Sequence, residues 1–461
     1  MENNFQRKLD LKLILSVIAA GLMSFTGVVV ATAMNVTFPT LMKQFGIGTA
    51  TVQWITTGYL LMLSVVIPLS SFLKKRFPMK CLFLFAVTIF IIATVMCMLA
   101  PTFTVLLLGR LLQGIGAGIA LPLMFNIVLE QTPFDKMGFM MGIASLIAAI
   151  APAVGPSFGG LIVNTLGWRM IFAFLLPLLV ISLAFGLYAI RQSSVTEPIS
   201  FDVPGYLLII VGFFCFIYAI NSASKVGWIS LRVIGLFFIC LAALFIFVHH
   251  TRHLDKPLID LHIFEISKFT FSVLFLILLQ FICLGIGFLL PNYSQLVMGE
   301  NALTAGCILL PGCIIGAILN PFTGKLLDHC GAPLPIFIGT VCALISSLLF
   351  AVFITIASTT ALAAIYIFFA LAQGFTVGNI MTNGLGSLSH HLKADGNAVF
   401  STFQQLAGAM GTSVVSTIVA SAQGSQSANM AAATMLGTRN SFILLLILAL
   451  IMAFCAYKAV K

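Results

Sequence analysis

The feature that most constrains this chain is a series of fourteen apolar runs, each long enough to cross a lipid bilayer. A segment inside a bilayer must satisfy its own backbone hydrogen bonds, so runs of this length predict helices. Charged residues make up only 7% of the sequence, whereas soluble domains carry about 25%. We therefore predict an all-α polytopic membrane protein with spans near 13–35, 52–73, 80–100, 104–128, 138–163, 168–190, 204–222, 229–248, 269–291, 303–323, 334–354, 359–382, 397–421 and 440–458.

The basic residues indicate how the spans are oriented. They concentrate after even-numbered spans, as in Lys74, Lys75 and Arg76 after the second, Lys136 after the fourth and Arg191 after the sixth. Loops rich in lysine and arginine stay in the cytoplasm, so we predict that both termini are cytoplasmic. The net charge of +10 then reports orientation and not nucleic-acid binding. The ten cysteines form no CxxC pair or Cys/His cluster, so we expect no disulfide and no metal site.

Two pairs of segments reveal an internal repeat. GRLLQGIGAG from Gly109 matches FALAQGFTVG from Phe369, and SFLKKRFPMK from Ser71 corresponds to GKLLDHCGAP from Gly324 at a similar offset. Each copy then holds six spans, and spans seven and eight form an insertion between the copies. We predict an N-terminal half over 1–192, two inserted helices over 193–262 and a C-terminal half over 263–461. Two such halves around a cavity near mid-membrane are typical of transporters.

The fifth span, Gly138 to Gly160, reads GFMMGIASLIAAIAPAVGPSFGG. Pro152 and Pro156 each remove an amide donor, so we expect this helix to bend. Taken alone, the stretch fits either a tightly packed membrane helix or a bending element of a transporter. Small residues at steps of three and four share one helical face, where another helix can approach closely; they are Ala144, Ala148, Ala151, Gly155 and Gly159.

Six segments occur in the order of one transporter family. They are MNVTFPTL (34–41), VQWITTGYLL (52–61), GRLLQGIGAG (109–118), AVGPSFGG (153–160), FDVPGYLL (201–208) and QLVMGENALTAGCILLPG (295–312) followed by GKLLDHCGAP. Together they resemble the fourteen-span drug:proton antiporters of the major facilitator superfamily, above all the Gram-positive lincomycin and multidrug resistance branch. The resemblance implies two six-helix halves plus two inserted helices, and an antiporter motif that includes Gly155, Pro156, Gly159 and Gly160.

The loop after the second span departs from the family pattern. It carries Lys74, Lys75 and Arg76 where the family has an acidic residue and glycines, which puts the gating salt bridge of the first half in doubt. The second copy of the loop keeps Gly324 and Asp328, so the resemblance assigns the gating role to those residues.

The first helix departs more seriously, because Ala31 stands where the family usually has a carboxylate, four residues before Asn35. Its expected partner is Arg110, since a guanidinium inside the membrane costs at least about 2.5 kcal/mol and must find acceptors. Arg110 either faces the first span, beside position 31, or is bonded to backbone carbonyls or extends toward the outer membrane surface. For the missing acid, two explanations remain open. Protons bind elsewhere, with Asp328 the next candidate, or alanine replaces a glutamate of the parent protein.

No acidic residue falls at mid-membrane, so uncharged polar and aromatic residues on the spans are the candidates for a substrate cavity. An interhelical hydrogen bond, worth about 0.6 kcal/mol on average, explains any single one of them better. As a group, however, some of them must line the cavity. The candidates are Asn35, Gln53, Trp54, Tyr59, Gln113, Asn126, Gln280, Asn292, Tyr293, Asn320, Asn379, Asn383 and Gln404.

The sequence contains no nucleotide-binding loop and no hydrolase, metalloprotease or dinucleotide signature in a suitable context, so we expect no enzyme and no cofactor. Transport would then draw on an ion gradient. We predict a monomer in the plasma membrane of a Gram-positive bacterium that exports lipophilic drugs in exchange for protons. Its partners would be drugs, protons and lipid. Two alternatives stay open: a carrier for one physiological solute and a membrane-embedded enzyme.

Overall fold

The computed structural model describes residues 10–47, 49–52, 54–192, 196, 201–254, 260–300, 302–425 and 430–461. These residues fold into helices, and the described part of the chain contains no strand. Among the described residues, thirteen helices are long and apolar enough to cross a membrane, and two shorter helices that meet at 50° bring the number to fourteen when counted as one span. The prediction of an all-α membrane protein with fourteen spans is therefore confirmed.

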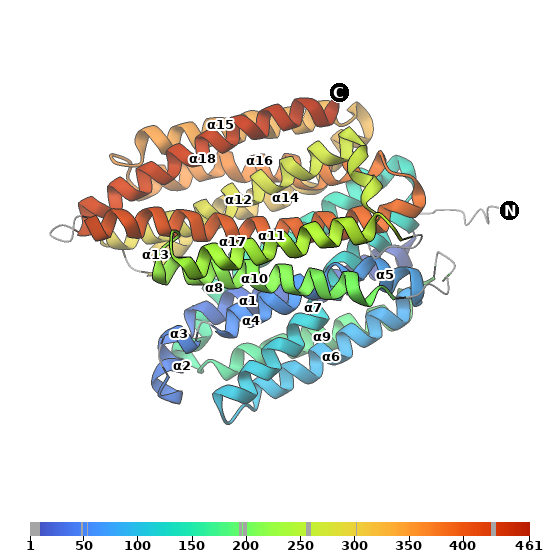
Figure 1. Ribbon diagram of the computed structural model, residues 1–461, viewed down its shortest axis with the longest axis horizontal. Helices are drawn as coiled ribbons and strands as arrows, with labels where there is room; N and C mark the ends of the chain where they lie inside the picture. The colour runs from blue at the N-terminus through green and yellow to red at the C-terminus, as the bar shows by residue number, and fades with distance from the viewer. Residues whose placement is uncertain are drawn as a thin grey trace.

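The first six spans form the N half, drawn in blue to blue-green in Figure 1. Helix α1 begins, and the last helix of the chain ends, at the same end of the bundle, which we call the terminal end (Figure 1). The helices of the N half are α1 (Leu11–Val36), α2 (Phe38–Phe45), α3 (Thr49–Val52), α4 (Trp54–Val66), α5 (Leu69–Arg76), α6 (Met79–Met98), α7 (Phe103–Gln131), η1 (Phe134–Lys136), α8 (Met137–Thr165) and α9 (Arg169–Ala189).

The remaining spans form an inserted pair and a C half, and the two halves lie on opposite sides of the pair in Figure 1. The inserted pair is α10 (Val203–Val226) and α11 (Leu231–Thr251). The C half comprises η2 (Leu261–Glu265), α12 (Ser267–Leu296), α13 (Ala302–Cys307), α14 (Leu310–Cys330), α15 (Pro333–Phe353), α16 (Thr359–Gly386), η3 (His390–Leu392), α17 (Lys393–Ser425) and α18 (Met430–Val460).

Several helices begin at side chains that cap them. Asp10 accepts a hydrogen bond from the Leu13 amide at 2.8 Å, and Asp202 accepts one from the Gly205 amide at 2.9 Å. Such caps satisfy amides that have no partner inside the helix. Local sequence thus explains where α1 and α10 begin.

The second span is broken into two helices that meet at 50°. The chain breaks between α4 and α5, where Pro68 cannot donate a helical hydrogen bond. Helix α8 instead continues through Pro152 and Pro156. Helix α8 therefore has no break at its prolines, and the bend expected within the fifth span stays a prediction.

Helix α8 packs against both halves, and its glycines make this possible. It lies against α1 of the N half and against α14 of the C half. A Cβ atom on Gly159 would lie 2.8 Å from the Ala33 carbonyl oxygen of α1, and one on Gly142 would collide with the Asn320 backbone of α14. Alanine or a larger residue would therefore force these backbones apart. The fifth span is thus a junction between the halves.

The inserted pair lies against the boundary between the halves. Helix α10 packs on α4 of the N half and on α17 of the C half. The Tyr206 hydroxyl donates to the Val65 carbonyl, and the Ser413 hydroxyl donates to the Ile220 carbonyl, each at 3.4 Å. The pair is therefore in contact with both moving parts of a two-half architecture.

Candidate functional site

A buried carboxylate joins the halves at the terminal end. Asp395 lies in the first turn of α17 and is fully buried. Lys75 of α5 donates to its two oxygens at 2.9 and 3.1 Å, and the Ser71 hydroxyl donates to the same group. The backbone amide of Asp260, just before η2, donates to it at 3.1 Å. Asp395 therefore bonds to the N half and to the segment that follows the inserted pair.

A second carboxylate joins the halves at the same end. Asp328, near the end of α14, accepts hydrogen bonds from the amides of Gly138 at 2.8 Å and Phe139 at 3.0 Å. These amides open α8, so the carboxylate lies at the positive end of that helix dipole. Gly324 faces the Gly138 carbonyl so closely that a Cβ there would collide with it. The proposed gating residues thus lie where α14 meets the N half.

A third contact uses amides and lies slightly deeper. The Asn397 side-chain nitrogen of α17 donates to the Pro122 carbonyl and to Asn126 Oδ1 of α7, both at 2.9 Å. Both asparagines are buried. Asn126 was a candidate for the substrate cavity, but in this conformation it bonds across the closed boundary between the halves.

Acidic and basic groups also pair on the outer rim of the terminal end. Asp260 bonds to the ring of His262 at 2.7 Å. This hydrogen bond raises the pKa of His262 above its ordinary value. Partial burial tends to raise the pKa of Asp260, but the bonds from His262 outweigh it and lower that pKa. The pair lies next to the amide that bonds Asp395.

Arg110 lies inside the N half and is fully buried. Its Nη1 donates to Gln113 Oε1 at 2.8 Å, its Nε donates to the Ile55 carbonyl at 3.4 Å, and its guanidinium lies 4.3 Å from the Tyr59 ring centroid. Gln113 in turn donates to the Thr94 hydroxyl at 2.9 Å. Among the described residues, Nη2 has no hydrogen-bond partner. The guanidinium is thus bonded to uncharged groups.

The connection from Arg110 to the first helix runs through Tyr59. The Tyr59 hydroxyl donates to the Gly27 carbonyl of α1 at 3.0 Å, one helical turn before Ala31. Ala31 itself is half-buried. Of the orientations left open by the sequence, the bonds described here favour an arginine held by a carbonyl and an amide, with contact to α1 through the tyrosine.

Three other cavity candidates donate to backbone carbonyls. Asn379 donates to the Thr323 carbonyl of α14 at 3.2 Å, Asn383 to the Ala459 carbonyl of α18 at 2.9 Å, and Asn292 to the Phe288 carbonyl of its own helix at 2.8 Å. Tyr293 is buried, the Trp54 ring lies 6.3 Å from that of Tyr218, Gln280 Oε1 accepts from Gln373, and Gln404 is half-buried. Gln53 and the side chain of Asn35 lie outside the described residues.

A small polar cavity lies at the contact of α8, α14 and α16. Its volume of about 30 Å³ is enough for one water molecule. Ser145 and Asn320 line it, and Ser145 Oγ and Asn320 Oδ1 have no hydrogen-bond partner among the described residues. Gln373 and Tyr366 complete its polar lining. Of the sequence candidates, Asn320 is the one that lines this cavity.

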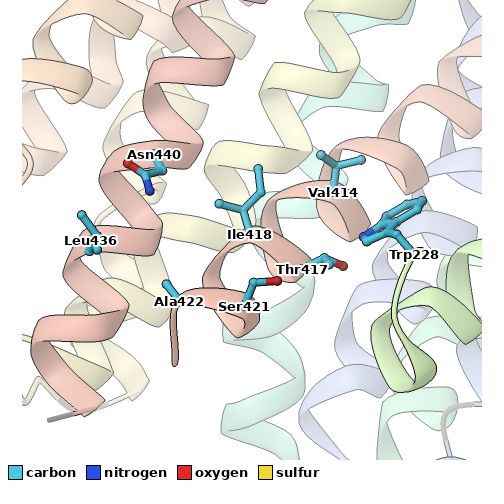
Figure 2. Close-up of a pocket in the computed structure, with 8 residues that line it drawn as sticks. All are labelled: Trp228, Val414, Thr417, Ile418, Ser421, Ala422, Leu436 and Asn440. Atoms are coloured by element: carbon cyan, nitrogen blue, oxygen red, sulfur yellow. The ribbon is translucent and has the colours of Figure 1, made fainter. Parts of the chain in front are cut away.

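A larger cavity of about 640 Å³ lies away from the contact between the halves. Figure 2 shows Trp228, on the turn between α10 and α11, beside Val414 and Thr417 of α17, with Leu436 and Asn440 on α18. None of the sequence candidates lines it. Its position between α17 and α18 gives it no part in joining the two halves.

Sequence reasoning missed the residues that join the halves from α17. Asp395 precedes, and Asn397 begins, the span predicted over 397–421, and neither was a candidate for a functional site. The available signal was an acidic residue in the first turn of a helix, where the dipole stabilises it. Gln373 had a clearer signal, because the internal repeat aligns it with Gln113.

A family model described as Major Facilitator Superfamily matches residues 15–412, which is most of the chain. The chain belongs to the Major Facilitator Superfamily. Lincomycin resistance protein LmrB of Listeria monocytogenes is 36% identical to it over 95% of both chains. Multidrug resistance protein Stp of Mycobacterium tuberculosis is 30% identical over 74% of this chain and 63% of its own length.

The fold is that of other superfamily transporters. The solved structure of the proton:xylose symporter XylE superposes with a TM-score of 0.67 at 14% identity, covering 98% of this chain and 95% of that one. At this identity the match shows the shared fold alone. The resemblance to the lincomycin and multidrug resistance branch is confirmed by the identity to LmrB.

Proposed function

We propose that this superfamily member exports lipophilic drugs from the cytoplasm by alternating access, in exchange for protons. The observation that carries the proposal is the 36% identity to LmrB, named for lincomycin resistance, over 95% of both chains. The two-half architecture supports it, because rocking of the halves would expose a central site to each side in turn. Transport, and not catalysis, is the proposed activity.

The orientation follows from the basic residues at the terminal end. Lys74, Lys75 and Arg76 lie there in α5, and positive loops stay in the cytoplasm. We therefore assign the terminal end to the cytoplasm, in the plasma membrane of a Gram-positive bacterium, with the protein as a monomer. The contacts of Asp395 and Asp328 then belong to a state closed on the cytoplasmic side. The proposed units remain 1–192, 193–262 and 263–461.

The proposed coupling to protons rests on Arg110 and the antiporter motif. No carboxylate falls at mid-membrane, and Ala31 stands at the position of the expected acid. Supporting features are the buried Arg110 and the antiporter motif, in which Gly155 and Gly159 of α8 bring its backbone against α1. This contact would transmit a change in α1 to the junction between the halves. Pro156 and Gly160 complete the motif.

The decisive test is energised efflux from cells loaded with a lipophilic dye. Cells expressing the chain, or its Ala31→Glu form, should extrude the dye faster than cells with an empty vector, and a protonophore should abolish the difference. Extrusion that survives the protonophore but stops when ATP is depleted would reject proton exchange.

A panel of unrelated antibiotics separates multidrug export from a carrier for one solute. Multidrug export predicts reduced susceptibility to several lipophilic compounds of different structure. Protection against none of them, with normal protein in the membrane, would favour a carrier for one physiological solute.

A further inference from the structure

We propose that Asp395 holds the cytoplasmic gate shut. We further propose that residues 260–265, which follow the inserted pair, contribute to that gate. The inference rests on the proposed function, since a gate has meaning in a protein that alternates between two open sides. It adds a residue and a connection that the repeat and the family resemblance do not assign.

The burial of Asp395 is the first reason. Its side chain is 0% exposed, whereas that of its partner Lys75 is 29% exposed. A carboxylate removed from water needs donors for its lone pairs, and Ser71, Lys75 and the Asp260 amide supply them. None of these donors belongs to the six spans of the C half. When the cytoplasmic side opens, the carboxylate must give up the donors of the N half and meet water instead.

The internal repeat gives the second reason. Aligning the loop from Ser71 with the loop from Gly324 places Lys75 at the position of Asp328. In the second copy the acid, Asp328, lies near the end of α14 and accepts from amides that open α8. In the first loop a base takes that position, and the acid lies in the opening turn of α17.

In the Lys75–Asp395 contact a base occupies the repeat position and the carboxylate comes from the C half, whereas in the Asp328 contact the carboxylate occupies that position itself. Both contacts nevertheless join the two halves. In both, a carboxylate lies at the N-terminal end of a helix, where the dipole favours negative charge. In both, the bond crosses from one half to the other. The absence of an acid from the first loop is thus compensated by Asp395, and the first half keeps a gate of its own.

The segment after the inserted pair gives the third reason. The Asp260 amide donates to Asp395 Oδ2 at 3.1 Å, and the Asp260 side chain caps η2 by accepting from the His262 amide at 3.0 Å. The cap orients the backbone whose amide reaches Asp395. This segment, residues 260–265, is thereby bonded to the same carboxylate that joins the halves, so opening the gate must release the segment or carry it along.

The gate can be measured without any substrate. Cys81 at the start of α6 and Cys330 at the end of α14 are both exposed, and they lie on different halves at the terminal end. Spin labels on these two residues, with the other cysteines replaced by alanine, report the separation of the halves by electron–electron double resonance. In the labelled protein without a gate substitution, the two labels should give one dominant short distance.

Asp395→Asn should move this distribution toward longer distances, raising the open population by about tenfold or more, since removing one member of a buried ion pair leaves the other unpaired. Lys75→Met should have a similar effect. The double variant should be no more open than either single one, because the ion pair is lost in all three and the double variant leaves neither of its charges unpaired. Asp10→Asn is the matched control, since its ion pair with Arg191 stays within the N half.

A second comparison isolates the segment after the inserted pair. The backbone of Asp260 has φ −75°, which proline can adopt. Asp260→Pro removes both the side chain and the amide hydrogen, whereas Asp260→Ala removes the side chain alone. Asp260→Pro should therefore open the gate more than Asp260→Ala does.

An unchanged distance distribution in both Asp395→Asn and Lys75→Met would overturn the proposal and leave closure to Asp328 and Asn397. Equal distributions for the two Asp260 variants would reject the role of residues 260–265. Dye efflux on the same variants keeps the two questions apart. If the variants change the distance distribution but the protein exports no dye, the proposed function is rejected and the role of Asp395 in the gate is retained.

Discussion

At the scale of single residues, the unusual group is a buried arginine that has no acidic partner among the residues the structure describes. The guanidinium of Arg110 bonds to Gln113 and Ile55 and stacks on Tyr59, all of them uncharged. A buried charge is expensive unless it is well bonded, and Nη2 has no partner within the described part of the chain. Arg110 therefore has unused capacity to bind one more acceptor.

Introducing an acid on the first helix tests whether that capacity belongs to proton coupling. Ala31→Glu should raise the drug-driven proton flux in proteoliposomes severalfold, because a carboxylate near Arg110 would bind a proton in one state and release it in the other. Ala31→Gln has nearly the same shape without the charge and should leave the flux unchanged. Equal flux from the glutamate variant and the unaltered chain would place the coupling group elsewhere, with Asp328 the next candidate.

The bonds of Gln113 make a second prediction at this scale. Gln113→Leu removes an acceptor from Arg110 and a donor to Thr94, so it should lower the stability of the N half by about 1–3 kcal/mol. Gln373, its counterpart in the repeat, donates to Gln280 at 3.5 Å, a longer bond than either of those made by Gln113. Gln373→Leu should therefore lower the midpoint of thermal unfolding in detergent by less than Gln113→Leu does. An equal decrease in the two variants would contradict the assigned role of Gln113.

At the scale of elements, α8 is the helix on which the two halves meet. Gly138 and Gly142 allow α14 to approach, and Gly155 and Gly159 allow α1 to approach. The small residues of the fifth span therefore serve two neighbours and not a single interface. Any movement between the halves must slide or tilt these backbone contacts.

Bulk on this helix should stop transport while the protein still inserts. Gly159→Leu would press on Ala33 and force α1 and α8 apart, an overpacking that costs about 1–3 kcal/mol. We expect efflux to fall to the vector level with normal membrane content. Gly235 of α11 has open space around it, so Gly235→Leu is the matched control and should transport normally. Full efflux by Gly159→Leu would show that the contact of α1 with α8 is dispensable.

At the scale of the whole molecule, the charges are segregated. All twelve acidic residues map to termini, loops or span ends, and among the described residues Arg110 is a fully buried cation inside the N half. Charges in a medium of low dielectric act over long distances. The interior is therefore unfavourable for a second positive charge.

This distribution predicts which compounds are exported. Uncharged lipophilic compounds should be extruded at least about tenfold better than quaternary ammonium analogues of similar size, because no carboxylate near mid-membrane can pair with the cation. Efflux assays with matched pairs of dyes measure the ratio, and Ala31→Glu should reduce it. Preferred export of the quaternary compounds would show that an acid reaches the cavity in another state of the transport cycle.

The sequence by itself determined the class of the protein, the number of spans and the repeat. The thickness of the bilayer sets the length of a span, and the absence of water in the bilayer core favours helices. These properties can therefore be predicted from runs of apolar residues. The glycine spacing of the fifth span also predicted close helix contacts. It did not reveal that these contacts involve two different helices, because spacing describes one helix and not its neighbours.

Only the tertiary structure decided where the chain breaks and what closes the terminal end. Pro68 interrupts a span whereas Pro152 and Pro156 do not, since packing around each proline determines whether the helix continues. Lys75 and Asp395 are 320 residues apart in sequence, and nothing local to either one names its partner. Their pairing depends on how the two halves pack against each other. The donors that satisfy the buried Asp395 carboxylate reach it only in this packed arrangement.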